Sequence, residues 1–180
     1  KKNICAVTGS RAEYGLLKKL LKKIKNDRNL NLKLVVTGTH LSPEFGNTYR
    51  EIIKDRFIIN DKIKILSRSD TPIAICKSIS KGVIEFAKSF KKIKPDIIVL
   101  LGDRYELLSA ATASLILQIP IAHLHGGETT LGAFDESIRH SITKMSHLHF
   151  VTSQLYKRRV IQMGENPRNV YNVGGFGVDA

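Results

Sequence analysis

Short apolar runs alternate along this chain with longer amphipathic stretches, and this alternation limits the possible folds more than any other feature. The run at 97–101, IIVLL, contains no polar residue, and a helical pattern follows it at 105–117. Strands that are apolar on both faces are typical of parallel sheets with helices packed on both sides. The pattern therefore predicts an α/β fold with a doubly wound, Rossmann-like parallel sheet and right-handed crossovers.

The alternation extends over most of the 180 residues, a length that suits one domain. In the longest predicted helix, Thr71 is expected to be the N-cap and Pro72 the first helical residue. Pro95 and Asp96 are expected to end it. No solenoid repeat or low-complexity linker interrupts the pattern. The predicted strands cover 3–8, 32–37, 63–66, 97–101, 119–125, 148–153 and 170–174, and the predicted helices cover 16–25, 48–55, 71–93, 105–117, 135–147 and 154–164.

The chain has 29 basic and 16 acidic residues, a formal net charge of +13, which raises the question of nucleic-acid binding. Many of the basic residues gather at the ends of two predicted helices, where cations complement the negative end of the helix dipole. We therefore expect a solvated, stabilising surface and no nucleic-acid partner. The residues concerned are Lys22, Lys23, Lys25 and Arg28 in one helix and Lys88, Lys91, Lys92 and Lys94 in the other.

No apolar run approaches the roughly 20 residues that a membrane helix needs. The apolar run near the N-terminus ends at Thr8 and Gly9, and it is shorter than the apolar region of a signal peptide, which has about 7–15 residues. We therefore expect a soluble, cytoplasmic protein without a membrane partner.

The spacing of the cysteines and histidines predicts neither a metal site nor a bound cofactor. Cys5 lies in a predicted strand and Cys76 in a predicted helix, and we expect both to be reduced, buried thiols. His123 and His125 alternate on a predicted strand, so they should point to opposite faces and not chelate one ion together. We expect His123 to be structural, whereas His125, at the end of its strand, fits a structural or a functional role equally.

Charged residues follow several of the predicted strands at the edge where such sheets bind ligands. Any single acid there is explained by the stability that it gives to a helix N-terminus. Their convergence at one edge nevertheless predicts a functional site. The residues are Gly9, Ser10, Arg11 and Glu13 after the first strand, Gly38, Thr39 and His40 after the second, Gly102, Asp103, Arg104 and Glu106 after 97–101, and His125, Gly126, Gly127, Glu128, Asp135 and Glu136 after 119–124.

The loop GSRAEYG, residues 9–15, leads into a predicted helix whose N-terminus suits a phosphate group. Arg11 adds a side chain that can bind phosphate through two hydrogen bonds. In a Rossmann strand order the first and fourth strands flank the crevice, so Arg11 and Asp103 are expected to face one ligand. The loop has neither the G-x-G-x-x-G nor the Walker A pattern, and a dinucleotide is therefore not predicted.

Four segments together resemble the UDP-N-acetylglucosamine 2-epimerase family, and in particular its hydrolysing branch. They are TGSRAEYG, VTGTHLSPEFGNTYREI, LLGDRYELLSAATA and HLHGGETTLGAFDESIRHSITKMSHLHFVTS, and they follow one another in the family's order. The resemblance implies a GT-B architecture, with the active site in a cleft between two Rossmann-like halves. Residues 1–180 would be the N-terminal domain, and the C-terminal nucleotide-binding domain would lie outside this chain. The implied partner is a UDP-sugar, and assembly into a homo-oligomer is left open.

The resemblance also implies a reaction. UDP-N-acetylglucosamine would lose UDP by elimination across C1 and C2, and water would then add to C1 while a proton returns to the other face of C2. The product would be N-acetylmannosamine for sialic acid synthesis, and residues 1–180 alone would be inactive. Two alternatives remain: a modified bacterial UDP-sugar, such as a 2,4-diacetamido-trideoxyhexose of a legionaminic acid route, and a nucleotide-sugar binding module without catalysis.

Several residues match functional positions of this family. Asp103 and Asp135 match catalytic acids. His125 stands where much of the family has a catalytic glutamate, and Glu128 offers a carboxylate three residues later, so the choice between them as the catalytic group is open. The residues that match substrate-binding positions are Arg11 and Arg104 at the diphosphate and Ser10, His40 and Arg139 near the sugar or phosphate.

Overall fold

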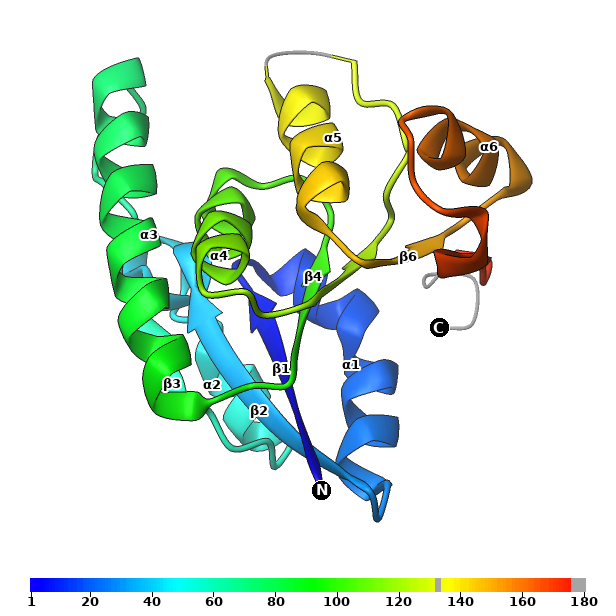
Figure 1. Ribbon diagram of the computed structural model, residues 1–180. Helices are drawn as coiled ribbons and strands as arrows, with labels where there is room; N and C mark the ends of the chain where they lie inside the picture. Colours follow the sequence, from blue (N-terminus) through cyan, green and yellow to red (C-terminus); the bar gives the residue numbers. More distant parts are fainter. Residues whose placement is uncertain (132–133, 176–180) are drawn as a thin grey trace.

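The structure is a computed structural model that describes residues 1–131 and 134–175. Within these residues, seven parallel strands form one sheet in the order β3-β2-β1-β4-β5-β6-β7 (Figure 1). The chain begins at β1 in the middle, winds outward to β3, and returns to β4 on the other side of β1, which confirms the predicted doubly wound sheet. The strands are β1 (Lys2–Thr8), β2 (Leu30–Thr37), β3 (Asp61–Ile63), β4 (Ile97–Leu101), β5 (Ile121–Leu124), β6 (Leu148–Val151) and β7 (Val170–Asn172).

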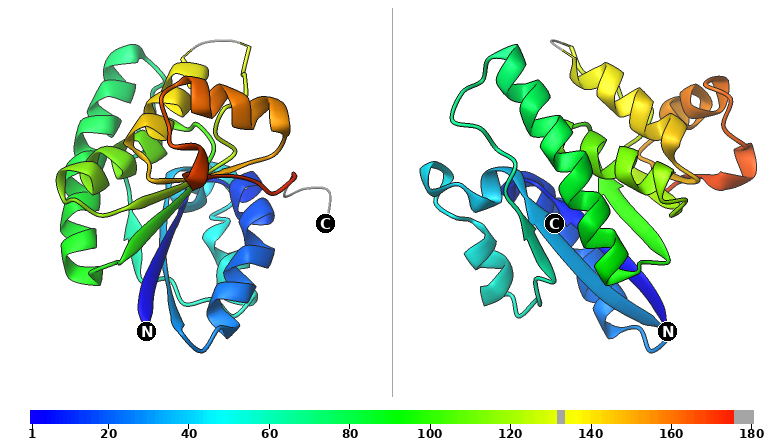
Figure 2. Two further views of the ribbon diagram at one scale, coloured as in Figure 1. Left: turned by 45° about the vertical axis from the view of Figure 1, so that its right-hand side comes forward. Right: turned by 60° about the vertical axis from the view of Figure 1, so that its left-hand side comes forward.

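Helices cover both faces of the sheet. In Figure 2, α3, α4 and α5 lie on one side of the strands, in green to yellow, and α1 lies on the other side in blue. The helices are α1 (Arg11–Asn26), α2 (Tyr49–Lys54), α3 (Pro72–Ile93), α4 (Tyr105–Ile116), α5 (Asp135–Met145) and α6 (Gln154–Gln162), and the 3-10 turns are η1 (Gly38–Leu41), η2 (Pro43–Phe45) and η3 (Pro167–Asn169).

The two-sided covering explains why the strands are apolar throughout. In β1, Cys5 and Val7 pack into the cluster formed with α3, α4 and α5, whereas Ala6 between them packs into the cluster formed with α1. Successive side chains of a strand point to opposite faces, so a strand covered on both sides needs apolar residues at every position.

A helix cap confirms the predicted start of the longest helix, and a second cap is found at the start of α1. The Thr71 hydroxyl accepts a hydrogen bond from the Ala74 amide at 3.3 Å, and Pro72 is the first residue of α3. The Ser10 hydroxyl likewise accepts from the Glu13 amide at 3.3 Å at the start of α1. Each cap satisfies a backbone N–H that the helix itself leaves without a partner.

Some predicted bounds and burials are wrong. The first helix was expected after the loop at 9–15, but α1 begins at Arg11. The third strand was expected at 63–66, but β3 pairs with β2 only over Asp61–Ile63. Ile65 is buried in the core although it lies outside the strand. An apolar residue in the sequence indicates burial, but it does not indicate that the backbone pairs with a neighbouring strand. Cys76 was expected to be buried and is exposed on α3, while Cys5 is buried as expected.

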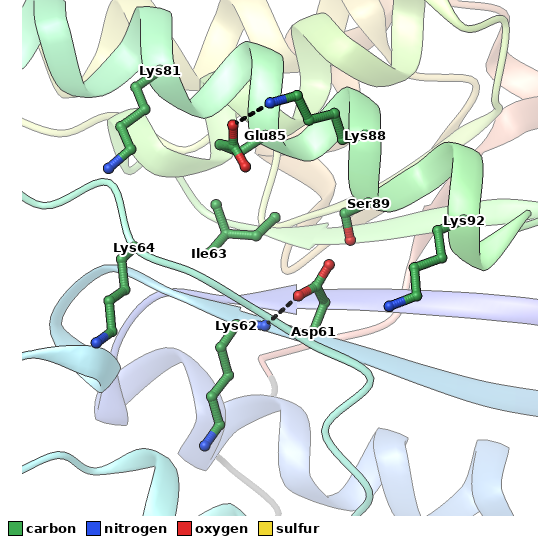
Figure 3. Close-up of a pocket in the computed structure, with 9 residues that line it drawn as sticks. All are labelled: Asp61, Lys62, Ile63, Lys64, Lys81, Glu85, Lys88, Ser89 and Lys92. Carbon is green, nitrogen blue, oxygen red and sulfur yellow. Dashed lines mark hydrogen bonds and ion pairs between the residues drawn. The ribbon is translucent and has the colours of Figure 1, made fainter.

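A groove of about 390 Å³ lies between β3 and α3 and is lined mainly by lysines (Figure 3). Lys88 in this groove pairs with Glu85 at 2.8 Å. Lysines beside an edge strand hinder pairing with another chain, and Lys91 and Lys92 lie in the last turn of α3 as predicted. The lining lysines are Lys62, Lys64, Lys81, Lys88 and Lys92.

None of the helices in the described part of the chain is long and apolar enough to cross a membrane. The cytoplasmic location stays a prediction.

Candidate active site

The strand order reverses between β1 and β4, which are hydrogen-bonded neighbours. The helices that follow these two strands, α1 and α4, pack on opposite faces of the sheet, so their strand ends border the crevice where doubly wound sheets bind ligands. Ser10 and Arg11 follow β1, and Asp103 and Arg104 follow β4. The residues predicted to form the ligand edge therefore follow neighbouring strands at the switch point, and consecutive residues of the β4 loop lie at its centre.

Asp103 contacts residues that follow β5. The Arg139 guanidinium, on α5, donates through Nη2 to Asp103 Oδ2, and the Thr130 hydroxyl donates to the same oxygen at 3.1 Å. Arg139 Nη1 donates to the carbonyl of His125 at 2.7 Å and lies 3.7 Å from Glu128 Oε2. One buried arginine thus joins the loops after β4 and β5. We call Asp103, His125, Glu128, Thr130 and Arg139 the Asp103 cluster.

The two candidates for the divergent catalytic position are neighbours within this cluster. His125 Nδ1 lies 3.2 Å from Glu128 Oε1, and the Thr152 hydroxyl donates to the same oxygen at 2.9 Å. Burial lowers the pKa of His125 below its usual value, the Glu128 carboxylate opposes this shift, and Arg139 adds to it. A neutral imidazole beside a carboxylate is therefore favoured at neutral pH, and the two groups can act together on one proton.

His125 is not on the strand, contrary to prediction. β5 ends at Leu124, and His125 has a left-handed backbone with φ of 64°. The expected alternation with His123 therefore does not apply. The bend continues at Gly127, where φ is 78° and a Cβ would lie 2.6 Å from the Tyr156 carbonyl oxygen. Only glycine fits there, and this close approach brings Glu128 back toward the sheet edge.

His123 is fully buried and connects the loop after β4 with α5. Its Nε2 donates to the Gly102 carbonyl at 2.8 Å, and its Nδ1 lies 3.1 Å from the Thr143 hydroxyl. Burial lowers its pKa to about 3, so the ring is neutral. Because both ring nitrogens have protein partners, the structural role expected for His123 is confirmed.

The Arg104 side chain is not part of the Asp103 cluster and contacts acids near the end of β1 instead. Its Nη2 and Nε donate to the two carboxylate oxygens of Glu106 at 2.8 and 3.2 Å, and Nε lies 3.8 Å from Glu13 Oε1. Glu13 in turn accepts a hydrogen bond from the Gly9 amide at 2.6 Å. We call Glu13, Arg104 and Glu106 the Arg104 cluster. Its arginine remains partly exposed at the end of the sheet, where an anionic ligand can reach it.

The other residues expected to bind substrate lie at the same edge in different settings. Ser10 caps α1. Arg11 is largely exposed and pairs with Glu51 at 3.2 Å. His40 is fully buried, with its ring nitrogens 3.0 Å from the Thr8 hydroxyl and 2.7 Å from the Thr48 hydroxyl. Burial lowers its pKa to about 4. Arg11 is open to a ligand, whereas His40 holds two loops together.

Asp135 begins α5, one turn before Arg139, and is half-buried. Within residues 1–131 and 134–175, no hydrogen bond or ion pair joins it to the Asp103 cluster. The structure thus brings together Asp103, His125, Glu128 and Arg139 but leaves Asp135 beside them, with its catalytic role still a prediction.

The sequence assigned no individual role to Glu13, Glu106 and Thr130 of the two clusters, nor to Thr152, which contacts Glu128. Glu13 and Glu106 are strand-end acids whose place in a first helical turn gave them an ordinary explanation. Thr152 follows β6 and could have been found by the same strand-end rule, whereas Thr130 lies in a loop whose path the sequence does not reveal. No group of three or more metal-ligating side chains occurs among the described residues.

The sequence of this chain is similar to those of known proteins. The sequence model of the family described as UDP-N-acetylglucosamine 2-epimerase matches residues 22–180. A Campylobacter jejuni protein named GDP/UDP-N,N'-diacetylbacillosamine 2-epimerase (hydrolyzing) is 53% identical over 98% of this chain and 46% of its own length. The Escherichia coli polysialic acid biosynthesis protein P7 is 43% identical over 99% of this chain and 46% of its own.

The fold is also found in a solved structure. The UDP-GlcNAc 2-epimerase of Methanocaldococcus jannaschii, in complex with UDP-GlcNAc and UDP, matches with a TM-score of 0.84 at 21% identity. The match covers 96% of this chain and 46% of that one. The chain thus spans about half the length of the relatives that it matches.

Proposed function

Because this chain belongs to the UDP-N-acetylglucosamine 2-epimerase family, we propose that it supplies one wall of the active site of a hydrolysing nucleotide-sugar 2-epimerase. One observation carries the proposal. Asp103 and Arg104, adjacent at the end of β4, place an acid–base cluster and a cationic cluster side by side at the point where the sheet binds ligands. The facing wall, which would hold the nucleoside, lies outside residues 1–180 in this proposal.

The reaction needs both clusters. A base removes the proton from C2, the C1–O bond breaks, and the nucleoside diphosphate leaves with the bonding electrons while a C1–C2 double bond forms. Water then adds its oxygen to C1, and C2 receives a proton on the opposite face. The products are the nucleoside diphosphate and the free 2-epimeric sugar. Positioned proton-transfer groups and a preorganised cation are what such steps require.

The Asp103 cluster handles the protons in this proposal. Asp103 is held by Arg139 and Thr130, so its carboxylate has a fixed orientation. Glu128 and His125 form a second proton-transfer pair across 3.2 Å. Asp135, on the first turn of α5, is assigned as the further acid that the family resemblance implies.

The diphosphate is assigned to the cations at the neighbouring ends of β1 and β4. Arg104 and Arg11 and the N-terminus of α1, capped by Ser10, provide positive charge and backbone N–H groups at one place. His40 and Arg139 are enclosed by protein groups, so we assign them to holding the site in shape.

The first substrate candidate is a nucleotide-linked 2,4-diacetamido sugar, supported by the name of the relative that is 53% identical. The second is UDP-N-acetylglucosamine, whose product would feed sialic acid synthesis. Its support is the relative that is 43% identical and is named for polysialic acid biosynthesis.

The test uses the natural protein that carries residues 1–180, incubated separately with UDP-N,N'-diacetylbacillosamine, its GDP counterpart and UDP-N-acetylglucosamine. NMR identifies any released sugar. We expect release of a free 2-epimeric sugar, fastest from a diacetamido substrate. Binding of all three without release would support the non-catalytic binding module and contradict the proposal.

A further inference from the structure

Two buried carboxylates hold the partly exposed arginine at the end of β4. Glu106 is fully buried and uses both oxygens, at 2.8 Å to Nη2 and 3.2 Å to Nε of Arg104. Glu13 is 7% exposed, and its Oε1 lies 3.8 Å from the same Nε. Among the described residues, neither acid has another cation within ion-pair distance.

We propose that Glu106 and Glu13 are positioning residues that fix the Arg104 guanidinium at the switch point and leave its Nη1 for the diphosphate of the nucleotide sugar. The inference rests on the proposed function, since the diphosphate is the leaving group of that reaction. The Arg104 side chain is 36% exposed, and within the described residues Nη1 makes no hydrogen bond.

The burial of these acids argues that they orient Arg104 and do more than stabilise the fold. Removing a carboxylate from water costs several kcal/mol, and apolar replacements for a buried ion pair are often as stable. Glu13 Oε1 is buried without a hydrogen-bond partner in the described structure, so the pair with Arg104 at 3.8 Å is incompletely formed. An arrangement of this kind costs stability and supplies a fixed cation.

The same acids connect three loops at the crevice. Glu13 Oε2 accepts from the Gly9 amide at 2.6 Å, in the loop after β1. Gly38 follows β2 with φ of 59°, and a Cβ there would lie 2.7 Å from Glu106 Oε1 and 2.6 Å from the Gly9 carbonyl oxygen. The loops after β1, β2 and β4 therefore meet at these two carboxylates. Arg104 cannot shift without disturbing all three.

The charge of Glu13 changes near neutral pH, because burial raises its pKa to about 7. The groups facing it are the backbone of Gly9 and Ser10 after β1, and Arg104 and Glu106 from the β4 loop and α4. As pH rises through this range, Glu13 gains negative charge and holds the Arg104 guanidinium in place more firmly. The affinity for UDP should therefore rise relative to that of a Glu13→Gln variant.

The experiment measures the dissociation constant of UDP by calorimetry on the natural protein that carries this chain. The variants are Glu106→Gln, Arg104→Gln and the double variant. The control is Glu165→Gln, which removes a largely buried carboxylate paired with His149 at 3.0 Å, away from the site. We expect Glu106→Gln to weaken UDP binding tenfold or more and the double variant to bind no more weakly than Arg104→Gln. The control should bind UDP like the wild type even if its melting temperature falls.

Unchanged UDP affinity in Glu106→Gln would overturn the inference, and so would additive losses in the double variant. If Glu106→Gln does not fold, the Glu13→Gln variant decides: it should bind UDP more weakly than the wild type at pH 8, and an unchanged affinity contradicts the inference. A wild type that binds UDP but releases no sugar refutes only the proposed function, and an active wild type beside an unaffected Glu106→Gln refutes only this inference.

Discussion

At the scale of residues, adjacent side chains at the end of β4 serve different neighbours. Asp103 is held by Arg139 and Thr130 from the β5 side, and Arg104 is held by Glu106 and Glu13 near β1. A dipeptide at a strand end can do this because successive residues point in different directions. In the proposed mechanism, the charged pair divides the crevice into a proton-transfer side and a diphosphate side.

Replacing Asp103 by asparagine should leave the fold intact and reduce turnover on the order of 10²–10⁴-fold, the range for loss of an acid–base group. Asparagine keeps the shape and can still meet Thr130, but it cannot accept a proton at neutral pH. Steady-state kinetics with the full-length protein, beside a melting curve, provides the check. A well-folded variant with wild-type turnover would remove Asp103 from the mechanism.

The pair formed by His125 and Glu128 yields a second prediction. Both Glu128→Gln and His125→Ala should lower turnover. Glu128→Gln should lower it more, because a carboxylate can act as the base at neutral pH. Its Oε1 lies 3.2 Å from His125 Nδ1. The control is Glu136→Gln, whose carboxylate pairs with His140 outside the cluster. Single-turnover rates make the comparison. An inactive histidine variant beside an active Glu128→Gln would reverse the assignment.

At the scale of elements, strands and helices follow from the sequence more closely than loops do. β4 is observed at its predicted bounds, because a run of five apolar residues between Asp96 and Gly102 fits only a strand buried on both faces. The expectation that residues following parallel strands meet at one edge of the sheet likewise placed Asp103, Glu128 and Arg104 together. It could not show that His125 leaves the strand with φ of 64°, nor that Arg104 turns toward Glu13, since both depend on the path of loops through space.

The bend after β5 can be tested through its glycine. Gly127→Ala puts a Cβ 2.6 Å from the Tyr156 carbonyl oxygen at φ of 78°. It should destabilise the protein by more than the about 1–2 kcal/mol of left-handed strain alone, and it should lower turnover by displacing Glu128. Denaturant unfolding and kinetics measure the two effects.

The matched control is Gly15→Ala, in the exposed interior of α1, where a Cβ meets nothing within 4 Å. Alanine there should stabilise the helix by about 1 kcal/mol. Equal stability changes at the two glycines would contradict the role assigned to Gly127.

At the scale of the whole molecule, the sheet and its helices form a complete core, while the proposed site is one wall of a cleft. Residues 1–180 should therefore fold as a unit without catalysing the reaction. Positioning of the reactants alone can supply about 7–11 kcal/mol of a barrier, and the sugar remains exposed to water on this wall. UDP binding should be weak, in the millimolar range, which corresponds to about −4 kcal/mol.

Calorimetric titration of residues 1–180 with UDP, and an assay before and after addition of the remaining part of the protein, would test this division. Full turnover by residues 1–180 alone would show that the second wall is unnecessary.

In the proposed mechanism the nucleotide sugar reacts by elimination and hydration, and isotopic labelling of the products distinguishes this from direct displacement. The full-length protein is given its substrate in D₂O and, separately, in H₂¹⁸O, and NMR and mass spectrometry locate the labels. We expect deuterium at C2 of the released sugar and no ¹⁸O in the released UDP, because the C1–O bond breaks and the diphosphate oxygen stays with phosphorus. A product that keeps its original C2 hydrogen, or UDP that carries ¹⁸O, would refute the proposed mechanism.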